Sequence, residues 1–458
     1  MNLPESLIQS LQNIKGFNEE AFKEVHQSGG QITSVRLNPG KIFNSQFPIF
    51  NSQLEKVQWN SNGYYLPERP SFTLDPLFHA GTYYVQEASS MFLEETIKQT
   101  VDLSKPIKIL DLCAAPGGKS TLIQSIISKE SLLISNEVIK TRVNILTENI
   151  TKWGAVNVIV TNNDPKDFQR LPNYFDVIVV DAPCSGSGLF RKDPNAINEW
   201  SENNVALCAQ RQQRILADIM PSLKDGGVLI YSTCSYSQEE DEAIGDWLME
   251  AFKVESLKLK VDEAWGIVET VSENGDAFCY RFYPDKVKGE GFFIVGFRKK
   301  NSAEVKSQKS KAKRNVDKLN SKEIEILKPY MYNGDDFFFI KQHDDVIALP
   351  SWLENELPDI QSSLYIKKAG VRLGAIIRNE LIPAHDLAVS NIINPSVARL
   401  EVDKETALQY LRKEAIKIEL DTRGWILLTH QQAGIGWIKA MQNRINNYYP
   451  KEWRILNK

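Results

Sequence analysis

Short apolar runs alternate with amphipathic segments through the middle of the chain, from about residue 81 to residue 300. The runs are continuous in apolar residues, which is typical of parallel strands buried on both faces. The segments between them place apolar residues on single helix faces, as at 121–127 and 138–150. This alternation predicts an α/β fold with a doubly wound sheet. Its seven strands are expected at 107–111, 132–136, 156–161, 175–181, 228–232, 278–283 and 292–297.

The flanking segments follow other patterns. The first 70 residues mix helical periodicity with a short strand near 32–37, which predicts a small α+β unit. After residue 300, a stretch rich in Ser and Lys lacks apolar periodicity and predicts a flexible linker. Beyond it, strand patterns predict a β-rich module, and a helix near 406–414 with a hairpin at 425–439 predicts a final unit. We therefore expect five parts: an α+β extension (1–75), the α/β domain (76–300), a basic linker (301–316), a β-rich module (317–388) and a C-terminal domain (389–458).

Length and composition fit this division. A chain of 458 residues exceeds what one hydrophobic core usually supports. No apolar run is long enough to cross a bilayer, and the N-terminus lacks the basic segment and apolar core of an export signal, so a cytoplasmic location without membrane contact is expected. The five cysteines include no Cys-x-x-Cys pair and the five histidines show no metal-ligand spacing, so neither a disulfide framework nor a metal site is predicted.

The net charge of −4 gives no global sign of nucleic-acid binding. Any contact with RNA must therefore be local. Candidate basic patches are 298–300, 306–314 and the tail residues Lys439, Arg444, Lys451 and Arg454. For any one of them, ordinary solvated surface charge is the simpler interpretation.

Three predicted strands run into loops that carry chemical groups. These loops are Asp111-Leu-Cys-Ala-Ala-Pro-Gly-Gly-Lys119, Asp181-Ala-Pro-Cys184-Ser-Gly and Ser232-Thr-Cys234-Ser. Because the carboxyl ends of parallel strands meet at one edge of a sheet, the loops are expected to converge on a single crevice. Two cysteines in one crevice suggest a thiol enzyme.

Together and in this order, the three motifs resemble the Fmu/Nop/Sun family of S-adenosylmethionine-dependent RNA cytosine-C5 methyltransferases. The resemblance covers about residues 81–300. Farther along, Gly370-Val-Arg-Leu-Gly374 followed by Pro383-Ala-His-Asp resembles the bacterial members that methylate small-subunit ribosomal RNA, and residues 389–458 resemble their PUA-like RNA-binding domain. The family often has Pro-His where this chain has Pro284-Asp285, which leaves the role of Asp285 open.

The resemblance implies S-adenosylmethionine as cofactor and ribosomal RNA, within the small subunit or its precursor, as partner. It makes residues 1–75 an RNA-contacting extension, although the residues alone fit a lid on the catalytic sheet equally well. Two alternatives stay open. One is the same chemistry on transfer RNA, and the other is a non-catalytic ribosome-assembly factor that binds RNA and retains the fold.

A cofactor cradle is expected where the strand at 107–111 turns into its helix. Gly117 and Gly118 let the backbone approach a ligand, and the helix offers free N–H groups to the methionine carboxylate. Glu137 follows the next strand and is placed for the ribose hydroxyls, while Asp164 follows the third and is placed for adenine. The motif is not the Gly-x-Gly-x-x-Gly fingerprint of nicotinamide enzymes. The predicted cofactor-binding residues are Cys113, through its backbone, Ala114, Ala115, Pro116, Gly117, Gly118, Lys119, Glu137, Asp164 and Asp181.

Four residues are predicted to carry the chemistry. Carbon 5 of cytosine becomes a nucleophile once a thiolate adds to carbon 6. Ser237 and Glu240 form a capping-box pattern, which predicts a helix just after Cys234 whose dipole favours its thiolate. The resemblance also makes Cys234 the nucleophile and gives Cys184 the later removal of the C5 proton. The Pro-Cys setting of Cys184 is, however, similar to the nucleophile of DNA cytosine methyltransferases.

Asp181 can contact nitrogen 3 of the base, and Lys119 can pair with Asp181 and set its proton. A strand-end carboxylate that merely caps the next turn is the alternative for Asp181. The remaining thiols, Cys208 and Cys279, fit core packing.

Overall fold

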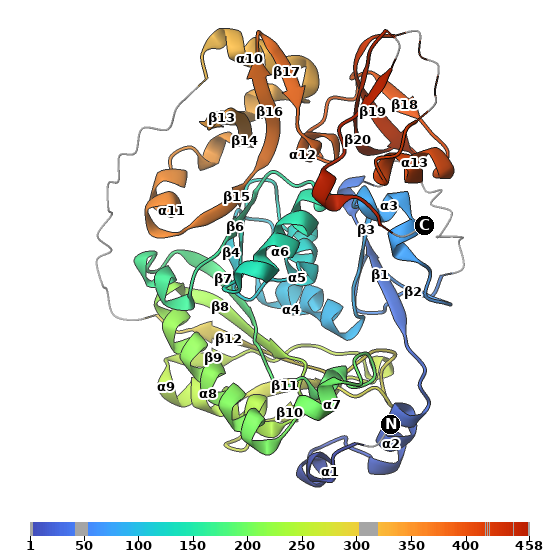
Figure 1. Cartoon of the computed structure of the whole chain (residues 1–458). Helices are drawn as coiled ribbons and strands as arrows, with labels where there is room; N and C mark the ends of the chain where they lie inside the picture. The colour runs from blue at the N-terminus through green and yellow to red at the C-terminus, as the bar shows by residue number, and fades with distance from the viewer. Residues whose placement is uncertain are drawn as a thin grey trace.

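The computed structural model describes residues 3–41, 54–301 and 319–456, apart from 417, 419, 421 and 443. Its centre is a mixed sheet of ten strands in the order β10-β11-β12-β8-β7-β4-β5-β6-β15, with β9 paired to β12 (Figure 1). Neighbours from β8 to β6 run parallel, and β12 runs antiparallel to β8. The strands are β4 (Lys108–Asp111), β5 (Leu132–Asn136), β6 (Val158–Thr161), β7 (Phe175–Asp181), β8 (Leu223–Thr233), β9 (Val254–Ser256), β10 (Val268–Val271), β11 (Phe278–Phe282), β12 (Phe292–Lys299) and β15 (Ile366–Ala369).

All seven predicted strands lie in this sheet, and the predicted α/β class is confirmed. Three further strands, β9, β10 and β15, complete it. The last of these comes from beyond the linker and pairs antiparallel with β6, with Ala369 opposite Ile159. A strand of four residues, Ile-Lys-Lys-Ala, carries too little apolar pattern to be recognised without its partner.

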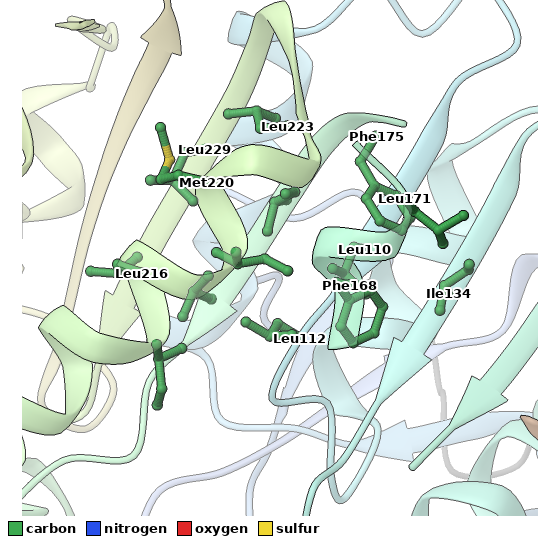
Figure 2. Packing of buried hydrophobic residues seen from close by; sticks show 14 of the residues in the cluster. Leu110, Leu112, Ile134, Phe168, Leu171, Phe175, Leu216, Met220, Leu223 and Leu229 are labelled. Carbon is green, nitrogen blue, oxygen red and sulfur yellow. The ribbon is translucent and has the colours of Figure 1, made fainter. Parts of the chain in front are cut away.

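Helices cover both faces of the sheet, because successive residues of each strand point to opposite sides. On one face α4 (Leu93–Thr100), α5 (Gly118–Ile126) and α6 (Lys140–Trp153) pack against Ile109 and its neighbours. On the other face α8 (Glu202–Ile219), α9 (Glu242–Ala251) and the turn η4 (Pro165–Arg170) pack against Leu110. Figure 2 shows this second layer, in which Phe168 lies beside Leu110 and Ile134 of the sheet, and Leu216 of α8 belongs to the same cluster. The helices predicted at 121–127 and 138–150 are α5 and α6.

The N-terminal part consists of a pair of helices and a small sheet. Its helices α1 (Glu5–Leu11) and α2 (Glu19–Gln27) share a core with Phe190 and Tyr236. A three-stranded sheet follows, made of β1 (Thr33–Leu37), β2 (Gly63–Leu66) and β3 (Tyr83–Val85) in the order β2-β1-β3. Because β3 pairs with β1, this sheet continues past the expected boundary at residue 75.

The C-terminal part contains two four-stranded sheets. The first belongs to the β-rich module and has α11 (Leu357–Ser363) beside it, and the second, with α13 (Lys404–Leu411), includes the predicted hairpin. Apart from Asn301, the linker and the basic run at 306–314 lie outside the described residues. The strands are β13 (Phe337–Gln342), β14 (Asp345–Pro350), β16 (Val371–Ile377) and β17 (Glu380–Pro383), then β18 (Arg399–Glu401), β19 (Gly424–His430), β20 (Ala433–Ala440) and β21 (Ile445–Asn447).

The N-terminal sheet and the last domain lie side by side, where α3 (Pro76–His79) contacts α13 and β20 (Figure 1). Within the three described ranges, no helix is both long and apolar enough to cross a membrane.

Candidate active site

Two cysteine sulfurs meet at the carboxyl edge of the sheet. Cys184 follows β7 and Cys234 follows β8, and these strands pair in parallel with Asp181 opposite Ser232. The register brings the two Sγ atoms to 3.0 Å from each other. Neither side chain is fully buried, so both thiols are within reach of a substrate. The expected convergence of the two cysteine loops is therefore present.

The surroundings of Cys184 favour its protonated form. The hydrogen bond with Cys234 and burial, together with the nearby charges of Cys234 and Glu240, raise the pKa of the Cys184 thiol well above its ordinary value. Cys184 consequently keeps its proton at neutral pH and can donate it toward the sulfur of Cys234.

Lys119 and Asp181 form an ion pair beside the sulfurs. Lys119 stands in the first turn of α5, and its Nζ lies 2.8 Å from Oδ2 of Asp181. The hydroxyl of Ser232 donates to the other carboxylate oxygen at 2.8 Å. Burial lowers the pKa of Lys119, but the charge and hydrogen bond of Asp181 outweigh burial, and the neighbouring Asp111 and Cys234 add to them, so the pKa ends above its ordinary value. The ammonium thus stays charged next to the thiols.

The helix expected directly after Cys234 does not form. Only one 3-10 turn, η7 (Gln238–Glu240), follows, and α9 begins at Glu242. Ser237 makes no side-chain capping bond, and the Glu240 side chain turns inward instead of back to the helix end, so neither bond of a capping box forms. The prediction that a helix dipole favours the Cys234 thiolate is therefore wrong, and the positive charge near this sulfur is that of Lys119.

Glu240 connects the two cysteine loops through hydrogen bonds to both of them. Its buried carboxylate accepts hydrogen bonds from the backbone N–H and the hydroxyl of Ser185, from the hydroxyl of Ser235 and from the side-chain amide of Gln212. Burial raises the pKa of Glu240, although these hydrogen bonds oppose the rise. Glu240 and Gln212 were not recognised from the sequence as part of the site. The signal available in the sequence was that a serine follows each cysteine. The structure shows that both serines bind the same carboxylate.

The predicted cofactor cradle connects β4 to α5. Gly117 has a φ of +118°, a left-handed conformation that favours glycine. A Cβ at Gly117 would meet Leu146 and Asn149 of α6 at 3.4 and 3.5 Å, which are ordinary contacts. The backbone conformation is therefore the reason for glycine here. The first N–H groups of α5 have no acceptor within the helix and can bind a carboxylate.

Two carboxylates near this loop have a buried oxygen without a hydrogen-bond partner among the described residues. Asp111 accepts the hydroxyl of Ser120 at 2.6 Å through Oδ2, whereas its Oδ1 is unsatisfied. Burial raises the pKa of Asp111 to about 7. Glu137 accepts the N–H of Ile139 through Oε1, and its Oε2 lies 3.5 Å from Arg142 without a hydrogen bond. Free acceptors of this kind fit the ammonium and ribose hydroxyls of S-adenosylmethionine.

Asp164 is less free than its predicted role requires. It caps the turn η4, where one carboxylate oxygen accepts the N–H of Lys166, and the other lies 3.7 Å from Arg214. Contact with adenine stays a prediction for this residue. Burial raises the pKa of the Cys113 thiol, which therefore stays neutral. Its expected contact with the cofactor, through the backbone, also stays a prediction.

The other predictions for polar side chains can be placed as well. Cys208 on α8 and Cys279 on β11 are buried in the core. Throughout the part of the chain that the structure describes, no three side chains of His, Cys, Asp or Glu are grouped so that they could hold a metal ion.

Three family models match successive parts of the chain. They are the N-terminal domain of 16S rRNA methyltransferase RsmF (residues 3–88), 16S rRNA methyltransferase RsmB/F (residues 99–298) and the methyltransferase RsmF PUA domain (residues 397–455).

Curated relatives match over nearly the whole length. A ribosomal RNA small subunit methyltransferase F from Shewanella woodyi is 29% identical over 436 residues, which cover 92% of this chain and 90% of the relative. One from Vibrio vulnificus is 29% identical over 484 residues, covering 98% of this chain and 97% of the relative.

Solved structures share the α/β domain. A methyltransferase homolog protein from Pyrococcus horikoshii is 28% identical with a TM-score of 0.52, covering 65% of this chain and 100% of its own. NSun6 from Pyrococcus horikoshii with SFG has the same fold, at 20% identity and a TM-score of 0.53, covering 65% of this chain and 99% of its own.

Proposed function

This chain belongs to the RsmB/F family of S-adenosylmethionine-dependent 16S rRNA methyltransferases, and we propose that it methylates carbon 5 of a cytidine in 16S rRNA through a covalent bond between Cys234 and carbon 6. The observation that carries this proposal is the contact of two cysteine sulfurs, 3.0 Å apart, beside the Lys119–Asp181 ion pair. A nitrogen methyltransferase would have no use for two thiols in this position.

In the proposed first step, a bond forms between Sγ of Cys234 and carbon 6. The electron pair of the C5–C6 double bond moves toward carbon 5, which becomes nucleophilic. S-adenosylmethionine supplies the methyl group, and the residues around Gly117, together with Asp111 and Glu137, would hold it. Asp181 would carry a proton to nitrogen 3 as negative charge develops on the ring, and the Lys119 ammonium, 2.8 Å from its carboxylate, can supply that proton.

In the proposed second step, the C5–H bond breaks and its electron pair re-forms the C5–C6 double bond. The electron pair of the sulfur–C6 bond returns to Cys234, and Cys184 takes the proton. The pKa of Cys184 is raised first by its hydrogen bond with Cys234 and further by the charge of that sulfur. Both contributions end when Cys234 is bonded to carbon 6. Burial and the charge of Glu240 remain, but adduct formation lowers the pKa of Cys184 and so favours loss of its resting proton to solvent, after which it acts as the base.

The flanking parts are proposed to bind the RNA. Residues 397–455 match the PUA domain model of the family, and α1 and α2 pack on the loops that follow the two cysteines. The substrate is expected to be the small ribosomal subunit or its precursor, in the cytoplasm.

The two thiol roles can be separated by what accumulates. Cys184→Ala should attack and methylate the base but fail to release it, so a protein–RNA adduct that survives a denaturing gel should build up when S-adenosylmethionine is present. Cys234→Ala and the double variant should form none. An adduct with Cys234→Ala would reverse the two roles. Bisulfite sequencing of RNA from a deletion strain distinguishes 16S rRNA from transfer RNA as substrate, and unchanged 5-methylcytosine in both would contradict the proposal.

A further inference from the structure

A cavity of about 490 Å³ lies between the start of α6 and the edge strand β15, away from the cysteines. One wall comes from the catalytic domain and the other from the segment that the C-terminal module adds to the sheet. Its lining residues are Lys140, Val143, Asn144, Asn162, Tyr365 and Lys367. We call this cavity the edge groove.

Tyr365 combines a fixed backbone with a free ring. Its carbonyl accepts the backbone N–H of Asn162 at 3.1 Å and the side-chain amide of Asn163 at 3.1 Å, and its own N–H donates to Asn163 at 2.9 Å. The side chain is nevertheless 64% exposed. A large aromatic ring that is held this firmly and left in solvent is suited to stack on a flat partner.

The charges of the groove favour an anion. Lys140 and Lys367 are exposed and form no ion pair with any described residue, and Asn144 likewise has no hydrogen-bond partner there. None of the described lining residues is acidic. Three apolar side chains next to the groove on α6 and the preceding loop, Val138, Ile139 and Ile145, are also about half exposed.

We infer that the edge groove binds an unpaired nucleotide of the RNA substrate, with its base stacked on Tyr365 and its phosphates near Lys140 and Lys367. The inference rests on the proposed function for the identity of the RNA. In the sheet, β15 lies four strands from β7, at roughly 19 Å for a spacing of about 4.8 Å per strand. The bound nucleotide is therefore several residues away from the target cytidine, and it contributes to affinity rather than to chemistry.

The test measures RNA binding without cofactor, so that it does not depend on methylation. An in vitro transcript of 16S rRNA is titrated with wild-type protein and with Tyr365→Ala, Tyr365→Phe and a Lys140→Ala/Lys367→Ala double variant. Tyr332→Ala and Lys322→Ala are matched controls, because Tyr332 is 60% exposed and Lys322 is exposed, both outside the groove. Calorimetry with S-adenosylmethionine and thermal melting accompany each variant.

Tyr365→Ala should weaken RNA binding roughly tenfold, since loss of one stacked base costs about 1–3 kcal/mol, while Tyr365→Phe should bind within about twofold of wild type. The double lysine variant should reduce the slope of log K against log salt concentration by about 2, because each lysine is expected to contact one phosphate. Affinity for S-adenosylmethionine should not change. Unchanged RNA affinity in Tyr365→Ala would overturn the inference, and so would a loss confined to S-adenosylmethionine, which would assign the groove to the cofactor. Absence of cytosine methylation in the wild type would refute the proposed function and leave this binding result standing.

Discussion

At the scale of single residues, protonation distinguishes two thiols that look alike in the sequence. Cys184 and Cys234 both follow a buried strand and both precede a serine. The charge of Glu240 and the contact with Cys234 favour the protonated form of Cys184, whereas Lys119 places its ammonium near Cys234. The proposed nucleophile, Cys234, is thus distinguished from Cys184 by neighbours that come from other strands and helices.

Glu240 offers a test of how strictly the two sulfurs must be positioned. Glu240→Ala removes the acceptor shared by Ser185, Ser235 and Gln212, so the loops should separate and single-turnover methylation should fall by about 10²-fold, as expected for a misplacement of about 1 Å. Affinity for S-adenosylmethionine should stay the same, because the cradle belongs to another loop.

Glu240→Gln should keep most of the contacts, because the serine hydroxyls can rotate to accept from the new amide. It removes the charge, which lowers the pKa of Cys184, so the pH profile of product release should move to lower pH. The exposed neighbour Glu239 provides the control Glu239→Ala. Methylation by Glu240→Ala within about threefold of wild type would contradict the positioning role.

At the scale of secondary-structure elements, hydrogen bonds from two strands fix the position of helix α5 at the carboxyl ends of the central strands. Arg36 of β1 is buried and binds Gln86, Thr121 and Ser125, so the N-terminal sheet is tied to α5, the helix of the predicted cofactor cradle. Asp111 at the end of β4 is tied to Ser120 in the same helix. The cradle therefore depends on how α5 is held from both sides.

The burial of Asp111 should give the cofactor-free protein a pH-dependent stability. The pKa of Asp111 is about 7 in the folded chain and about 4 in an unfolded one. Between these values the unfolded state is ionised while the folded state stays protonated, so stability is lost as pH rises from 4 to 7. From pH 5 to pH 8 the loss at this site should be about 2–3 kcal/mol.

Denaturant unfolding of wild type and Asp111→Asn at pH 5 and pH 8 tests this contribution, because groups remote from Asp111 titrate alike in both proteins and the comparison removes their effect. The free energy of unfolding of the variant should decline less over this interval. An equal decline in both proteins would show that Asp111 does not titrate in this range.

At the scale of the whole molecule, the parts on either side of the linker share their cores. One cluster joins Leu110 and Ile159 of the central sheet to Leu353 and Ile360 of the β-rich module, and another joins the N-terminal sheet to the last domain. With β15 inside the catalytic sheet, the module is part of the same folding unit. Its position also forms one wall of the edge groove.

A core substitution in the β-rich module should therefore also destabilise the catalytic domain. Ile360 on α11 is fully buried, so Ile360→Ala should lower the free energy of unfolding by about 2–5 kcal/mol in one cooperative transition. Hydrogen exchange should accelerate in β6 as well as in α11. The exposed Ser362 of the same helix gives the control Ser362→Ala. Two separate transitions, with β6 protection unchanged, would contradict the shared core.

The sequence by itself determined the α/β class, the seven strands and the three loops that carry the chemistry, because continuous apolar runs and strand-end motifs are local patterns. The tertiary structure alone decided what depends on contacts between distant segments. The role of β15 follows from pairing with β6, some 200 residues earlier. The orientation of Glu240 likewise depends on distant segments. Its carboxylate binds Ser185, Ser235 and Gln212 and does not cap the local helix end. Local propensity is weak compared with several buried hydrogen bonds to an acid, and only the fold brings those donors together.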